Sequence, residues 1–124
     1  MALFDTFLRP RTIKQIVGQA AEDRALSYLQ QRGLTLVERN FRCKGGEIDL
    51  VMQERNTLVF TEVRKRTDHR YGGAAASVTA RKQARLIIAA QVFLQRYKAP
   101  PACRFDVIAI DGEQMDWLQN VIEA

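Results

Sequence analysis

Two stretches decide the fold of this chain: Gly45-Gly46-Glu47-Ile48-Asp49-Leu50 and Val59-Phe60-Thr61-Glu62-Val63-Arg64. They belong to two apolar runs, residues 48–52 and 58–63, which flank the polar sequence Gln53-Glu54-Arg55-Asn56. Two apolar runs around a short polar break predict an antiparallel hairpin.

The register of this hairpin brings acidic side chains together. If the turn centres on Arg55-Asn56, Asp49 lies opposite Glu62. The same register pairs Glu47 with Arg64, Ile48 with Val63, and Met52 with Val59. Because side chains alternate between the faces of a strand, the paired acids share one face with Glu47, Arg64, Val51, Leu58 and Phe60.

Two carboxylates on a partly apolar face repel each other, so a positive group is expected between them. A divalent cation such as Mg²⁺ fits this requirement, because it takes one or two carboxylates and keeps positions for water and phosphate. A cluster of ion pairs built from Arg42, Lys44 or Arg104 would neutralise the acids equally well. The spacing leaves both readings open.

The size and composition are those of one ordinary globular domain. The chain has 124 residues, of which 47% are hydrophobic and 27% charged. We expect residues 1–12 to form an N-terminal arm and residues 13–124 a single domain. We also expect a cytoplasmic protein without a membrane segment, since no apolar run reaches the roughly 20 residues that span a bilayer. Two cysteines and one histidine cannot fill a four-ligand zinc site.

The charge is unevenly distributed. Residues 67–98 carry six Lys or Arg against one Asp, whereas residues 99–124 carry one Arg against five acids. A net charge of +5 with this asymmetry favours a polyanionic partner. We therefore expect a nucleic acid, DNA before RNA, as the partner, and leave homodimerisation open.

The remaining sequence predicts two helices and three more strands. Apolar residues recur at helical spacing over 13–32 and 79–97, and Gly33 fits the end of the first helix. Residues 34–39, 103–110 and 114–118 have the pattern of strands, with basic loops at 40–46 and 65–73. The order α-β-β-β-α-β-β predicts an α/β fold in which two helices cover the faces of one mixed sheet.

Several basic residues are candidates for binding nucleic acid. Arg81, Lys82 and Arg85 lie in the first turns of the second predicted helix, where positive charge is unfavourable unless an anion is bound. A solvated basic face is the plain alternative. The other candidates are Gln83 on the same helix and the loop residues Arg42, Lys44, Lys65, Arg66 and Arg70.

Four short motifs carry a resemblance that covers residues 18 to 117. Gly-Glu-Ile-Asp-Leu, Phe-Thr-Glu-Val-Arg, Tyr-Gly-Gly-Ala-Ala-Ala-Ser-Val-Thr and Arg-Phe-Asp-Val follow one another as in the bacterial YraN family. The pattern also resembles the PD-(D/E)XK nuclease superfamily, in particular archaeal Holliday-junction resolvases. This resemblance implies a restriction-endonuclease-like α-β-β-β-α-β core, extended here by a C-terminal hairpin.

The superfamily resemblance also implies roles for individual residues. Asp49 and Glu62 would bind Mg²⁺ or Mn²⁺ together with the backbone carbonyl of Val63, and Glu22 would be a supporting carboxylate. Arg64 stands at the lysine position of the motif. An arginine stays protonated and cannot take a proton from water, but it can orient that water or offset transition-state charge.

The expected function is therefore metal-dependent hydrolysis of nucleic-acid phosphodiesters, with branched DNA as one substrate. A nucleic-acid-binding module without turnover is the main alternative. A protein-interaction domain with structural carboxylates is the third.

Overall fold

A computed structural model describes residues 12–66 and 78–122 of this chain. The predicted N-terminal arm, apart from Thr12, and most of the basic loop that includes Arg70 lie outside these residues. No helix in the described ranges is long and apolar enough to cross a membrane.

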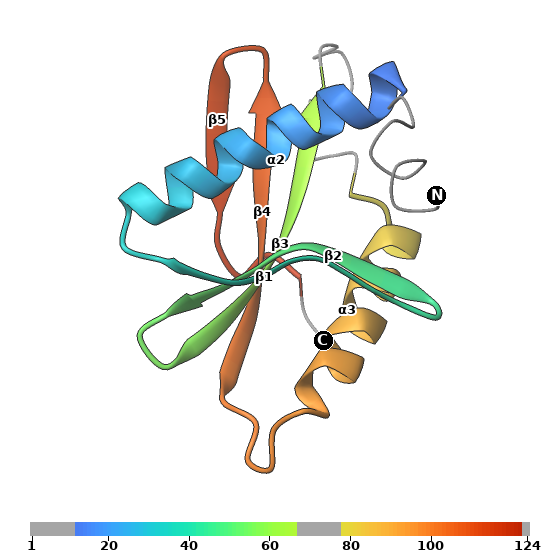
Figure 1. Ribbon diagram of the computed structural model, residues 1–124, viewed down its shortest axis with the longest axis vertical. Helices are drawn as coiled ribbons and strands as arrows, with labels where there is room; N and C mark the ends of the chain where they lie inside the picture. Colours follow the sequence, from blue (N-terminus) through green and yellow to red (C-terminus); the bar gives the residue numbers. More distant parts are fainter. Residues whose placement is uncertain (1–11, 67–77, 123–124) are drawn as a thin grey trace, which may run out of the picture.

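The described residues form two helices and one mixed five-stranded sheet (Figure 1). The elements are α2 (Ile13–Gln31), β1 (Thr35–Cys43), β2 (Gly46–Glu54), β3 (Thr57–Arg66), α3 (Ala80–Leu94), β4 (Ala102–Asp111) and β5 (Gln114–Leu118). The strand order is β1-β2-β3-β4-β5, with β3 and β4 parallel and the other neighbours antiparallel. The predicted α-β-β-β-α-β-β order is confirmed.

Local sequence signals explain where the helices begin and end. Thr12 and Gln15 form a reciprocal capping box at the start of α2, and Thr79 caps α3 by accepting a hydrogen bond from the Lys82 amide. Gly33 follows α2 with a φ of +94°, a conformation that L side chains rarely adopt. Gly33 thus ends the helix, as its position predicts.

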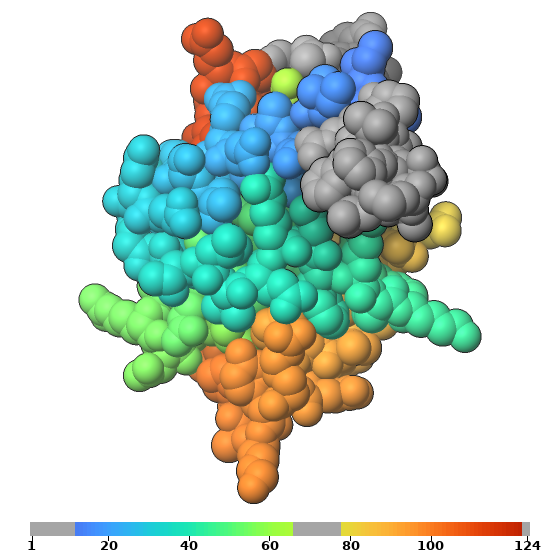
Figure 2. All heavy atoms as spheres, viewed as in Figure 1, coloured from blue at the N-terminus to red at the C-terminus, as the bar shows by residue number. Residues whose placement is uncertain are grey.

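The two helices cover opposite faces of the sheet. Under α2 lies one apolar cluster, which includes Leu50, Met52, Val59 and Ile108. Under α3 lies a second cluster, which includes Val51, Phe60, Phe93 and Phe105. Figure 2 shows the first face, where the blue atoms of α2 lie over the strands. Each helix therefore has its own half of the core.

Three predicted boundaries are wrong. Strand β1 continues to Cys43 through the residues predicted as a basic loop, strand β3 continues to Arg66, and α3 ends at Leu94 instead of Tyr97. In β1, Phe41 packs edge-on against Phe93 of α3, with ring centroids 5.3 Å apart. The apolar contact of Phe41 explains why this basic segment joins the sheet.

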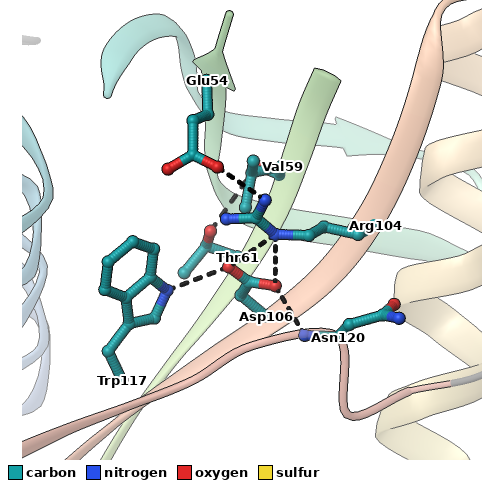
Figure 3. Close-up of polar contacts among 7 residues, drawn as sticks. All are labelled: Glu54, Val59, Thr61, Arg104, Asp106, Trp117 and Asn120. Carbon is teal, nitrogen blue, oxygen red and sulfur yellow. Dashed lines mark hydrogen bonds and ion pairs between the residues drawn. The ribbon is translucent and has the colours of Figure 1, made fainter. Parts of the chain in front are cut away.

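A buried polar cluster joins the last two strands to the rest of the sheet (Figure 3). The Asp106 side chain is fully buried and accepts hydrogen bonds from Arg104 Nε, Trp117 Nε1 and the Asn120 amide, at 3.1, 2.9 and 2.8 Å. Arg104 Nη1 also pairs with Glu54 at 2.8 Å. Arg104 therefore neutralises Asp106 and Glu54, not the predicted acidic pair.

Candidate active site

The acidic site forms where β2 and β3 stop pairing. The hairpin has the predicted register, with Met52 opposite Val59, and its last backbone pair is Leu50 with Thr61. Beyond that pair, the Val63 amide donates a 2.8 Å hydrogen bond to Asp49 Oδ2. The Asp49 carboxylate thus takes a place that a backbone carbonyl fills elsewhere in the ladder.

This side-chain insertion changes the predicted faces of the hairpin. Ile48 and Val63 were expected to share a face, but Ile48 packs in the cluster under α3 and Val63 against the cluster under α2. In the neighbouring strand, Asn40 has a left-handed φ of +55°. Strict alternation therefore ends at Asp49, and the acids lie at an opening between the strands.

Burial and nearby negative charge raise the pKa of both acids. Burial is the main cause that raises the pKa of Asp49 to about 6. The hydrogen bond from the Val63 amide acts in the opposite direction and lowers this pKa. Burial and the nearby charge of Asp49 raise the pKa of Glu62 to about 8. Only 14% of the Glu62 side chain is exposed. Asp49 and Glu62 thus lie near each other, as the register predicts, and both line one cavity.

Two cations accompany the acids. Arg64 Nη1 lies 3.5 Å from Glu62 Oε1. Lys82 of α3 is also close enough to lower the pKa of Glu62, and burial followed by the charge of Arg64 lowers the pKa of Lys82 itself. The site therefore joins two carboxylates with an arginine and a partly desolvated lysine.

Two cavities open at these residues. One, of about 310 Å³, is lined by Glu47, Glu62, Arg64 and four residues at the start of α3, which are Thr79, Arg81, Lys82 and Arg85. The other, of about 550 Å³, includes Asp49, Glu62, Arg64 and Lys65, together with Lys14, Gly18 and Glu22 of α2. Glu47, Glu62 and Arg64 line both cavities, so the acids lie between the starts of the two helices.

Glu22 lies near the acids but has a partner of its own. Arg39 Nε lies 3.4 Å from Glu22 Oε1, and Arg39 Nη2 pairs with Asp23 at 2.6 Å. The charge of Glu22 nevertheless contributes to the raised pKa of Asp49. Glu22 is therefore placed to act on the site through charge while Arg39 holds its side chain.

The donor set for a metal is smaller than predicted. Within the described residues, no three His, Cys, Asp or Glu side chains are grouped closely enough to hold a metal ion. Asp49 and Glu62 remain as a pair, and the Val63 carbonyl points to the same side of its strand as the Val63 amide, toward Asp49. Two carboxylates with water and phosphate are a sufficient set for Mg²⁺.

The predicted nucleic-acid residues divide into three groups. Lys65, Arg81, Lys82 and Arg85 line the two cavities. Arg42 is exposed, lies 3.5 Å from Glu47, and borders a neighbouring cavity beside Glu22. Lys44 lies in the exposed β1–β2 turn, Gln83 donates to the Val78 carbonyl, Arg66 ends β3, and Arg70 lies outside the described residues.

Sequence reasoning gave no role to two residues of the site. Glu47, which the predicted register placed on the face of the acids, lines both cavities. Lys14 lies on the same face of α2 as Gly18 and Glu22, at helical spacings of four residues. That spacing is visible in the sequence, although helical periodicity alone does not show which face meets the hairpin.

Comparisons with known proteins place this chain among proteins without an assigned activity. The model of an uncharacterised protein family, UPF0102, matches residues 21–110. A UPF0102 protein of Herminiimonas arsenicoxydans is 72% identical over 120 residues, which cover 96% of this chain and 97% of the relative. A UPF0102 protein of Ralstonia pickettii is 59% identical over 116 residues, covering 90% and 93% of the two chains.

Proposed function

Because this chain belongs to the uncharacterised UPF0102 family, also called YraN, we propose its function from the site itself: metal-dependent hydrolysis of phosphodiester bonds in nucleic acid, DNA foremost. The observation that carries this proposal is the pair of neighbouring carboxylates, Asp49 and Glu62, of which Glu62 also lines the cavity at the basic start of α3. We also place the protein in the cytoplasm, where its free thiols Cys43 and Cys103 would stay reduced.

The acids suit a divalent cation. Two carboxylates that repel each other in a partly desolvated site gain when a cation replaces their protons. Asp49, Glu62 and the Val63 carbonyl would hold Mg²⁺ or Mn²⁺ there, with Glu22 adding negative charge nearby. When bound, such an ion lowers the pKa of a water ligand and stabilises charge on a phosphate.

The neighbouring cations suit the phosphate. Hydrolysis adds water across a P–O bond, and negative charge develops on the phosphoryl and leaving oxygens. Arg64 and Lys82 lie beside Glu62, where they can offset this charge. Arg64 cannot take the proton from water, so its contribution is orientation and charge.

The alternative is a nucleic-acid-binding module of the same fold without turnover. The observation that favours it is Arg64, because a fixed cation at this position binds phosphate without providing a base. Under this alternative the acids would still set the position of a metal or of Arg64. Cleavage separates the two functions.

We test the proposal with labelled linear, flapped and four-way DNA in Mg²⁺, Mn²⁺ or EDTA. The wild type should cleave at least one substrate, and only when metal is present. Asp49→Asn should cleave that substrate at least about a hundredfold more slowly. Asp116→Asn is the matched control, since it removes an exposed carboxylate on β5. Equal cleavage by wild type and Asp49→Asn would sink the proposal, and salt-dependent binding without cleavage would establish the binding module.

A further inference from the structure

Arg39 connects the edge strand β1 to one turn of α2. In the sheet register Arg39 lies opposite Leu50, which belongs to the cluster under α2, so the Arg39 side chain is on the α2 face of the sheet. Its guanidinium contacts three acceptors of α2, which are Glu22 Oε1 at 3.4 Å, Asp23 Oδ1 at 2.6 Å and the Gln19 carbonyl at 3.3 Å. One side chain of β1 thus spans the helix from residue 19 to residue 23.

The two carboxylates that Arg39 contacts differ in their surroundings. Asp23 makes the shorter contact, and 58% of its side chain is exposed. Only 17% of the Glu22 side chain is exposed, and Glu22 borders the cavity of the acids. Because the shorter of two charged hydrogen bonds is the stronger one, Asp23 anchors the guanidinium. The longer contact then fixes the Glu22 carboxylate while leaving much of its negative charge available to the cavity.

Without Arg39, the Glu22 carboxylate would have two places to lie. Glu22 lines the cavity that contains Asp49 and also a neighbouring cavity of about 380 Å³, which is lined by Asn40 and Arg42. Arg42 is an exposed cation with which a released Glu22 could pair. In the folded protein the charge of Glu22 reaches the acids, because it adds to burial in raising the pKa of Asp49. Arg39 therefore decides which of the two cavities receives this charge.

We propose that Arg39 is a positioning residue for the metal site, which holds the Glu22 carboxylate beside Asp49 so that its charge strengthens the binding of the cation. This inference rests on the proposed function and adds a residue that contacts neither the metal nor the phosphate. The affinity of a site for a divalent cation rises with the number of carboxylates around it. Residues that orient the groups around a metal typically change its affinity by about 10- to 100-fold.

The sign of the effect separates positioning from simple electrostatics. A guanidinium near a metal site repels the metal, so removing Arg39 would tighten metal binding if only its charge mattered. Positioning has the opposite consequence, because the loss of Arg39 also releases Glu22 from its place beside Asp49. If Glu22 is already neutral, only the repulsion remains to be removed.

The test is the binding of Mn²⁺ in the absence of nucleic acid, measured by electron paramagnetic resonance of the free ion. Arg39→Ala should bind Mn²⁺ about tenfold more weakly than the wild type, and Glu22→Gln should show a similar loss. The double variant should bind no more weakly than Glu22→Gln alone, since Arg39 acts through Glu22. Arg39→Lys keeps the charge but cannot span three acceptors, so its loss should be smaller. It replaces Arg39→Ala in the same cycle if that variant does not fold.

Arg24→Ala is the matched control. Arg24 also joins α2 to the sheet, through the Gly112 and Glu113 carbonyls at 3.4 and 3.5 Å, but it lines neither cavity at the acids. This substitution should lower the free energy of unfolding and leave the affinity for Mn²⁺ unchanged.

Three results would overturn this inference alone. They are unchanged or tighter Mn²⁺ binding by Arg39→Ala, additive losses in the double variant, and equal losses in Arg39→Ala and Arg24→Ala. A wild type that binds no Mn²⁺ would overturn the proposed metal-dependent function as well.

Discussion

At the scale of single residues, the raised pKa values of Asp49 and Glu62 make metal-free stability depend on pH. Their ordinary values are 3.8 and 4.5, and the folded protein raises them to about 6 and about 8. Between the ordinary and the raised pKa values the folded state holds more protons than the unfolded chain, so the free energy of unfolding falls as pH rises. The stabilising contribution is complete below about pH 4 and is lost through about pH 8.

Glu62→Gln should therefore flatten this dependence. In EDTA we expect the wild type to lose stability between about pH 5 and 8 by an amount on the order of 1 kcal/mol or more, and the variant to lose less. At pH 8 Glu62→Gln should be the more stable protein. Denaturant unfolding across this pH range measures both, with Glu113→Gln in the exposed β4–β5 turn as control. Parallel curves of unfolding free energy against pH for the wild type and Glu62→Gln would contradict the raised pKa of Glu62.

The sequence predicts the meeting of these two acids because two apolar runs and a turn at Arg55-Asn56 set the register of the hairpin. It does not predict the insertion of Asp49 beside Val63, which depends on a side chain replacing a backbone acceptor. Nor does it predict the hydrogen bond from Arg39 to Glu22, since the two residues are seventeen positions apart in sequence. Pairing across strands is periodic, whereas competition between individual polar partners is set by the folded geometry.

At the scale of elements, Gly46 sets the contact between β2 and α3. A Cβ there would overlap the Arg85 carbonyl and come within 3.1 Å of the Ala89 amide nitrogen. The β1–β2 turn therefore lies directly on the helix backbone, with Gly45 against Ile88. This contact fixes the helix that carries Lys82 and Arg85 relative to the strand that carries Glu47 and Asp49.

Gly46→Ala should destabilise the protein by about 2 kcal/mol or more, because the backbone of α3 must move to admit the methyl group. Gly18→Ala makes the same chemical change inside α2, where a Cβ would meet no atom of the described structure within 4 Å. It should raise stability, because alanine favours a helix over glycine. Urea unfolding of the two variants measures this contrast. If Gly46→Ala unfolds at the wild-type urea concentration, the close contact does not determine the packing of α3.

Sequence patterns predict these elements well where the apolar pattern is strong, as in α3, β2 and β4. They fail in the second half of β1. This strand has a register shift between Leu36 and Glu38, and Asn40 has a left-handed backbone conformation, so its side chains do not alternate regularly. A bulged strand with exposed polar residues has no clear period of two, so the segment appears as a basic loop. The chemistry of Gly45-Gly46 is visible in the sequence, but its contact with α3 is not.

At the scale of the whole molecule, one group of basic residues lies beside the acids and the acidic residues gather in the last two strands. Arg81, Lys82 and Arg85 lie at the start of α3 beside the acids, while the acidic segment after residue 99 forms β4 and β5. Such an arrangement directs a polyanion toward the two cavities at the acids. It also makes binding depend on salt, since each phosphate contact releases counterions.

Replacing Arg81, Lys82 and Arg85 together by Ala should weaken DNA binding and reduce the slope of log affinity against log salt by about two. A second triple variant, Arg24, Arg32 and Lys98 to Ala, removes the same charge elsewhere on the surface and should change the slope much less. Fluorescence anisotropy from 50 to 300 mM salt, as an approximate range, measures both slopes. Equal slopes for the two triple variants would show that net charge, not the basic start of α3, governs binding.

The buried Asp106 has a consequence for local unfolding. Its partners Trp117 and Asn120 lie on and just after the edge strand β5, and the Val121 amide donates to the Phe105 carbonyl at 3.0 Å. If β5 detached from the sheet, β4 would carry a buried carboxylate without two of its three donors. Fraying of this edge strand is therefore costly, and the segment from β4 to residue 121 should open as one unit in hydrogen exchange.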